Sequence, residues 1–153
     1  MRLARPTALA GGDDVLVVVD TNIVVAGLLT SDPGSPTARI LDGMLDGGVH
    51  FVVSVDLLAE YRTVLLRPAV MQRHGLSADE VDELLEHLAQ LAAVREAVEP
   101  PEQPPDPGDL HLWALLAATP GAALVTGDRE LLEHPPSFAR VVSATDFVVL
   151  PKG

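Results

Sequence analysis

The run VLVVV at residues 15–19 is apolar at all five positions and rich in β-branched side chains. Such a run is typical of a strand covered on both faces, and strands of this kind belong to parallel sheets packed between helices. Asp20 follows the run directly and precedes the helix-like segment TNIVVAGLL. Because a carboxylate is costly to bury, Asp20 must have a structural or a functional reason to stand there.

Strand-like and helix-like segments alternate along the rest of the chain. Further strands are expected at HFVVSV (50–55), AVREAV (93–98, an edge strand), AALVTG (122–127) and ARVVSA (139–144). Helices are expected at residues 21–29, 36–45, 56–67, 77–93, 109–118 and 128–133, with Ser77 and Glu80 in a capping-box pattern, and a final turn or helix is expected at residues 145–148. The alternation predicts an α/β fold of three layers, α/β/α, around a central parallel sheet of about five strands.

Length and composition limit the possible architectures. The chain has 153 residues, of which 48% are hydrophobic, and this suits one compact domain, expected at residues 15–150. Residues 1–14 show no periodicity and are expected to form a flexible N-terminal lead-in. The absence of cysteine excludes disulfides and thiolate zinc sites. No apolar run has the length of a signal peptide or a membrane span, so we expect a cytoplasmic protein.

Two aspartates are expected at one edge of the sheet. Ligands of open parallel sheets bind outside the carboxyl ends of the strands, where Asp20 follows the first strand and Asp128 follows AALVT. The structural alternative for each is an N-cap or first-turn acid, which stabilises a helix by about 1 kcal/mol.

A glutamate in the helix at residues 56–67 joins this set. At 100° per residue the apolar side chains fill one arc of the helix, and Glu60 lies at the edge of that arc, beside Leu57 and Val64. Its structural alternative is a salt-bridged residue at the core boundary.

The third candidate is an aspartate in DPGDLHLWALLAA. Asp109 is enclosed by apolar positions of the helix and is expected to point inward, whereas His111 is expected to face away; these apolar positions are Leu110, Leu112, Trp113, Leu116 and Ala117. The alternative is a capping box with Asp106 as N-cap, Pro107 at N1 and Asp109 at N3. That alternative explains the spacing but does not explain burial of Asp109.

Four converging acids predict a divalent cation, because neighbouring carboxylates raise each other's pKa when no cation lies between them. Oxygen ligands suit Mg²⁺ or Mn²⁺. Such a site supports hydrolysis of a phosphodiester, with the metal lowering the pKa of the attacking water. Asn22 and Thr126 are expected to hold the ligands or the water by hydrogen bonds.

Four segments together carry a resemblance to a known family. In order, VVVDTNIVVAGLL, LLAEYRTVL, DPGDLHLWALLAA and ALVTGDRELL resemble the four acidic motifs of PIN domains, over about Val15 to Val149. Within that family the chain resembles the VapC-like toxin ribonucleases of bacterial toxin-antitoxin systems.

The resemblance implies a Mg²⁺- or Mn²⁺-dependent endoribonuclease with Asp20, Glu60, Asp109 and Asp128 as its acidic site and Asp106 in reserve for Asp109. It also implies Asn22 and Thr126 as the polar residues near the first and last acids. The implied partners are an RNA substrate, a protein antitoxin and a second copy of the chain.

Charge sets this chain apart from many such nucleases. The net charge of −12 opposes broad contact with a phosphate backbone, although a metal-bridged site remains compatible with it. Basic candidates near the expected edge are Arg62, Arg67, Arg73 and Arg129, each of which is also readily explained as a solvated charge.

Two other classes of protein remain open. In a phosphatase or phosphoacceptor domain Asp20 would be the nucleophile, but Asn22 stands where a second aspartate is needed, and the only lysine is Lys152. The other class is a PIN-like binding module without activity. The presence of all four acids favours the nuclease.

Overall fold

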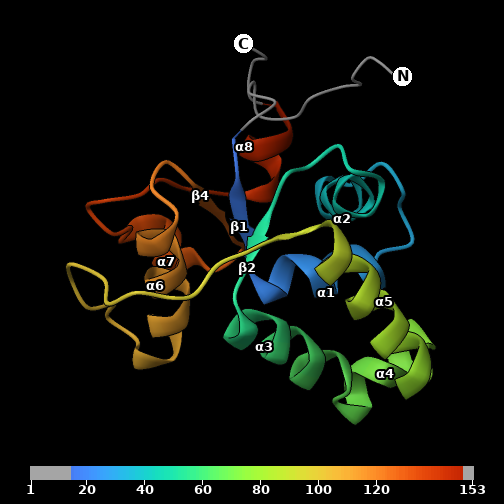
Figure 1. Cartoon of the computed structure of the whole chain (residues 1–153). Helices are drawn as coiled ribbons and strands as arrows, with labels where there is room; N and C mark the ends of the chain where they lie inside the picture. The colour runs from blue at the N-terminus through green and yellow to red at the C-terminus, as the bar shows by residue number, and fades with distance from the viewer. Residues whose placement is uncertain (1–14, 150–153) are drawn as a thin grey trace.

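The computed structural model describes residues 15–149, and its five strands form an all-parallel arrangement (Figure 1). β1 (Val17–Val19), β4 (Ala123–Val125) and β5 (Val141–Val142) pair in the order β1-β4-β5. β2 (Val52–Val53) pairs with β3 (Ala93–Val94), and a bridge from Val17 to Phe51 joins the two pieces. The predicted α/β fold with a parallel sheet is confirmed.

Eight α-helices connect these strands in the described part of the chain. They are α1 (Thr21–Leu29), α2 (Pro36–Asp46), α3 (Val55–Leu65), α4 (Pro68–His74), α5 (Ala78–Leu91), α6 (Leu110–Ala118), α7 (Arg129–Glu133) and α8 (Ala144–Val149). A 3₁₀ turn, η1 (Pro107–Asp109), leads into α6. In Figure 1 the strands run between α6 and α7 on one side and the group from α1 to α5 on the other.

The core explains why the first strand is apolar at every position. Val17, Val18 and Val19 are all buried, since helices cover both faces of β1. From α3, Leu57, Tyr61 and Leu65 pack into the same core cluster. The Tyr61 hydroxyl donates a 2.6 Å hydrogen bond to the carbonyl of Val19, which fixes α3 against the end of β1.

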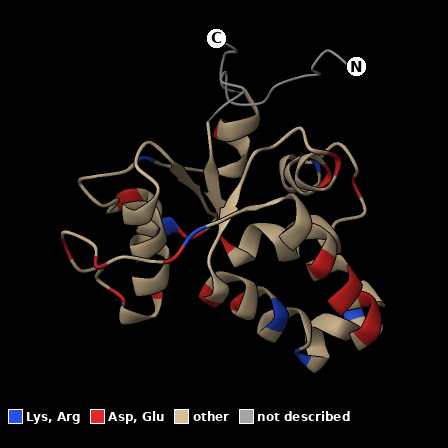
Figure 2. Cartoon of the chain, viewed as in Figure 1, with Lys and Arg blue, Asp and Glu red and all other residues tan. Residues whose placement is uncertain are grey.

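The outer surface is strongly acidic. Figure 2 shows acidic residues along α5 and few basic residues between them.

The predicted capping box of α5 is present, with Ser77 accepting from the amide of Glu80 and the Glu80 carboxylate accepting from the amide of Ser77. Among residues 15–149, no helix is both long and apolar enough to cross a membrane.

Two details differ from the predictions. The segment from Pro68 to His74 forms α4, a helix that the sequence pattern does not predict. Proline ends the preceding helix because it lacks an amide hydrogen, yet it is favourable at the first position of a new helix. The strands are also shorter than expected, two or three residues each. The predicted lead-in at residues 1–14 and the last residue of the predicted domain lie outside the described residues.

Candidate active site

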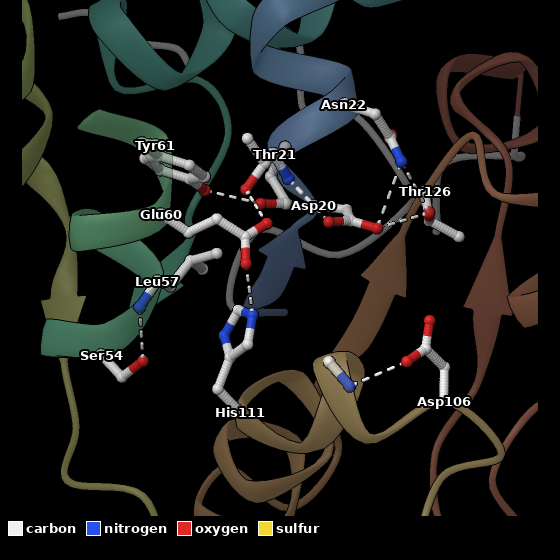
Figure 3. Close-up of polar contacts among 12 residues, drawn as sticks. Asp20, Thr21, Asn22, Ser54, Leu57, Glu60, Tyr61, Asp106, His111 and Thr126 are labelled. Carbon is white, nitrogen blue, oxygen red and sulfur yellow. Dashed lines mark hydrogen bonds and ion pairs between the residues drawn. The ribbon is translucent and has the colours of Figure 1, made fainter. Parts of the chain in front are cut away.

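Asp20 stands where β1 ends and α1 begins. Its backbone amide still belongs to the sheet, donating to the carbonyl of Val125 over 2.9 Å. Its side chain, in a residue only 6% exposed, accepts from the amide of Thr21 (2.7 Å) at Oδ1 and from the Thr126 hydroxyl (2.7 Å) and Asn22 Nδ2 (3.3 Å) at Oδ2 (Figure 3). Asp20 is therefore an N-cap, as the structural alternative predicted, and also a buried carboxylate at the edge of the sheet.

Burial dominates the ionisation of this group. Loss of solvent raises the pKa of Asp20 above its ordinary value, and the nearby Glu60 carboxylate raises it further. The hydrogen bonds from Thr126 and Thr21, and the proximity of His111, act in the opposite direction without cancelling the effect. A cation bound beside Asp20 would relieve this cost.

Asn22 and Thr126 tie together the loops that follow β1 and β4. Asn22 Oδ1 accepts from the amide of Gly127 (2.9 Å), and Asn22 Nδ2 lies 3.4 Å from the Thr126 hydroxyl oxygen. That oxygen also accepts from the amide of Asp128 (3.0 Å). Asp128 in turn caps α7, accepting from the amide of Glu130 (2.9 Å). The two aspartates are thus held at adjacent strand ends by a shared network.

Glu60 reaches the same network from α3. Its Oε2 accepts from the Thr21 hydroxyl over 2.7 Å, and its Oε1 lies 2.7 Å from Nε2 of His111 (Figure 3). A carboxylate can only accept, so the histidine nitrogen donates. Glu60 is a boundary residue, but its partners place it beside Asp20.

The expectation that His111 faces away was wrong. The ring points at α3, and its Nδ1 is buried without a partner among the described residues. Leu110, expected on the core face, is 40% exposed instead. α6 is apolar almost all round, with every residue from Leu112 to Leu116 buried, so its pattern does not single out one inward face. Thr21 and His111 are site residues that the pattern of acids alone did not reveal.

The two aspartates of DPGD have different roles. Asp106 caps η1 by accepting from the amide of Gly108 over 2.9 Å, so the capping alternative is correct for this residue. Asp109 precedes α6 and makes no capping hydrogen bond with its side chain. Partial burial and the charges of Asp106, Asp20 and Asp128 raise the pKa of Asp109 to about 6. Asp109, and not Asp106, lines the same cleft as the other acids.

That cleft has a volume of about 710 Å³. All four predicted acids line it, namely Asp20, Glu60, Asp109 and Asp128, together with Thr21 and Asn22. Its remaining wall is apolar and basic, formed mainly by Val25, Ala26, Leu29, Val64, Arg67 and Arg73. Of the other basic candidates, Arg62 pairs with Asp82 (2.8 Å) and Arg129 with Glu133 (3.7 Å), so both are solvated surface charges.

The donors of the cleft fit Mg²⁺ or Mn²⁺, which prefer carboxylate oxygens. Within residues 15–149, no three acidic or histidine side chains lie close enough to enclose an ion by themselves. Mg²⁺ does not need such a cage, because it keeps several waters and binds through one or two carboxylates. Burial first, and then the charges of Asp106, Asp20 and Asp128, raise the pKa of Asp109, so a cation bound beside these carboxylates would offset their repulsion.

Comparison with known proteins agrees with this arrangement. No curated protein sequence is significantly similar to the chain. Residues 16–130, which hold all four acids of the cleft, match the PIN domain family. Because the match spans most of the described residues and the parallel sheet brings those acids together, the chain belongs to the PIN domain family, whose members are in general nucleases.

Proposed function

We propose that this protein is a Mg²⁺- or Mn²⁺-dependent endoribonuclease that hydrolyses phosphodiester bonds of RNA. The observation that carries the proposal is the convergence of Asp20, Glu60, Asp109 and Asp128 on one cleft, where burial and then the neighbouring acids raise the pKa of Asp109. Clustered carboxylates that repel one another are the binding groups of a divalent cation.

Each acid has a role that follows from its contacts. Asp20, Asp109 and Asp128 would hold the cation, one or two of them directly and the others through its bound waters, and Asn22 and Thr126 fix the orientation of the Asp20 carboxylate. When bound there, the cation would supply Lewis-acid chemistry, lowering the pKa of a water molecule and neutralising charge on the phosphate.

Glu60 acts on the proton of the attacking water. Thr21 donates to Oε2 of Glu60, and His111 donates to Oε1. Each oxygen keeps a second lone pair that can accept a hydrogen bond from a water in the cleft. A carboxylate held in one orientation in this way is suited to take up a proton as the water attacks phosphorus.

The biological setting is proposed from the resemblance to VapC-like proteins. In this setting the protein is a toxin that acts in the cytoplasm, forms a homodimer and is held inactive by a protein antitoxin. Induced expression in a bacterial host should then arrest growth, and the Asp20→Asn variant should not.

The first experiment measures metal binding and cleavage together. The melting temperature of the wild-type protein is measured in EDTA and then in excess Mn²⁺, alongside cleavage of a mixed single-stranded RNA. We expect Mn²⁺ to raise the melting temperature and to start cleavage, because the cation binds only the folded site.

Two variants complete this experiment. Asp20→Asn keeps the shape of the side chain and an N-cap oxygen but removes a charge, so it should lose both the Mn²⁺ effect and cleavage. Asp42→Asn is the matched control, because Asp42 is exposed on α2. Absence of both effects in the wild-type protein would instead identify a PIN-like binding module without activity.

A further inference from the structure

The cleft continues past its acids along two helices. The nine residues of α1, from Thr21 to Leu29, carry one wall of the cleft, and the first and last of them are about 12 Å apart along the helix axis. On the facing side the wall runs from Glu60 through Val64 of α3 to Arg67 and then Arg73 of α4. We call the part formed by Leu29, Val64, Arg67 and Arg73 the arginine end. It lies farther along both helices than the acids.

We propose that the arginine end binds a phosphate of single-stranded RNA next to the one that is cleaved, with the apolar wall contacting the adjoining base. This inference rests on the proposed nuclease function and adds to it a subsite for the substrate. It assigns a role to Arg67 and Arg73 that the chemistry of bond cleavage does not require.

Charge is the first argument. The chain has a net charge of −12, so a phosphate is attracted only where basic side chains are free of acids. Arg62 and Arg129 form ion pairs on the surface, yet neither Arg67 nor Arg73 forms an ion pair with another residue of the described part. Two cationic side chains that line a cleft and have no acid bound to them there are available to an anion that enters it.

The apolar wall is the second argument. Val25, Ala26, Leu29 and Val64 are partly buried aliphatic residues between the acids and the arginines. Bases offer an apolar face to such a wall only when the strand is unpaired. The residues that line the cleft include no aromatic ring, so base stacking adds little and affinity should depend mainly on phosphate contacts.

The charges of the cleft favour a strand that extends past the acids to the arginine end. A phosphate beside Asp20 and Glu60 is repelled by them until a cation binds, whereas a phosphate at the arginine end is attracted in every state of metal loading. The subsite therefore aligns an RNA strand along α1 and α3, with one phosphate held by arginine and another presented to the acids.

The test compares arginines inside and outside the cleft. The variants Arg67→Gln, Arg73→Gln and the double variant are set against Arg62→Gln and Arg129→Gln, all in full-length protein with Mn²⁺ and single-stranded RNA. Each cleft variant should raise KM about fivefold with kcat unchanged, and the double variant should raise it more. Each removed phosphate contact should lower the slope of log KM against log salt by about 0.7. The outside variants should change neither quantity.

The substrate supplies an independent control. A neutral methylphosphonate linkage placed beside the cleaved bond removes the same charge from the RNA. When the methylphosphonate replaces the phosphate that the arginine end binds, it should raise KM for the wild-type protein. It should not raise KM for the double variant, because that variant has already lost the contact.

The outcomes separate this inference from the function on which it rests. If the wild-type protein with Mn²⁺ cleaves no RNA, both are overturned. If the wild-type protein cleaves RNA but the double variant keeps the wild-type KM and salt slope, the subsite is refuted while the nuclease function is retained. The two arginines would then bind another ligand, such as an acidic segment of a protein partner. Equal effects from the outside arginines would also refute a localised subsite.

Discussion

Asp109 gives a quantitative test of the acidic site without any activity assay. In the folded protein the pKa of Asp109 is raised from 3.8 to about 6, first by burial and then by the charges of Asp106, Asp20 and Asp128. Between these two pH values the folded chain binds more protons than the unfolded chain. The contribution of Asp109 to stability is therefore fully present below about pH 4 and is lost as the pH rises through about 6.

The size of the effect follows from the shift. A tenfold change in proton affinity corresponds to about 1.4 kcal/mol. The shift in the pKa of Asp109 from 3.8 to about 6 would therefore correspond to about 3 kcal/mol if solvent did not screen the charges. Asp109 is only partly buried, and water and salt around it reduce the effect to about 1 kcal/mol. Asp109→Asn removes this pH-dependent penalty, because the amide does not ionise.

The assay is urea unfolding in EDTA at several values between pH 4 and pH 7. The variant should match the wild-type protein at pH 4 and exceed its free energy of unfolding by about 1 kcal/mol at pH 7. Adding Mn²⁺ at pH 7 should stabilise the wild-type protein more than the variant. Asp42→Asn, on the exposed face of α2, should show no such trend. A variant that is equally or less stable at pH 7 would refute the repulsion from which this effect is derived.

Three further substitutions probe the contacts around the site. His111→Ala should lower kcat about tenfold because Glu60 loses the donor that orients it, and His111→Gln should restore part of the rate; equal rates for wild type and His111→Ala would contradict this. Tyr61→Phe leaves a buried carbonyl without its donor and should cost about 1–2 kcal/mol in urea unfolding, with little change in KM. Gly27→Ala would place a methyl group 2.6 Å from the Thr37 carbonyl oxygen of α2 and should cost about 1–3 kcal/mol; unchanged stability would mean that α1 and α2 separate easily.

The acids at the strand ends were accessible to sequence reasoning because one rule places them. The carboxyl ends of parallel strands meet at one edge, so Asp20 and Asp128 are brought together although the chain between them is long. The burial of Val17, Val18 and Val19 confirms the strand that fixes this edge. Which polar groups then contact each other depends on side-chain directions, which no spacing rule gives.

The error on His111 has a definite physical origin. A helical wheel distinguishes faces only when one face is polar, and α6 is buried on nearly all sides, from Leu112 to Leu116. The direction of His111 is set by Glu60 on α3, more than fifty residues earlier in the chain. Similarly, Pro68 was correctly interpreted as the end of one helix, but its second effect, the start of α4, was missed.

The bond between the Thr126 hydroxyl and Asp20 has a consequence for synthesis. The two residues are 106 positions apart, and β4, which ends just before Thr126, pairs directly with β1. A growing chain therefore carries Asp20 long before it can assemble the cleft, because β4 and Thr126 are synthesised long after β1. A chain that stops before β4 should lack both Thr126 and Asp128, so it should leave the Asp20 carboxylate without its Thr126 partner and the cleft without its wall on that side.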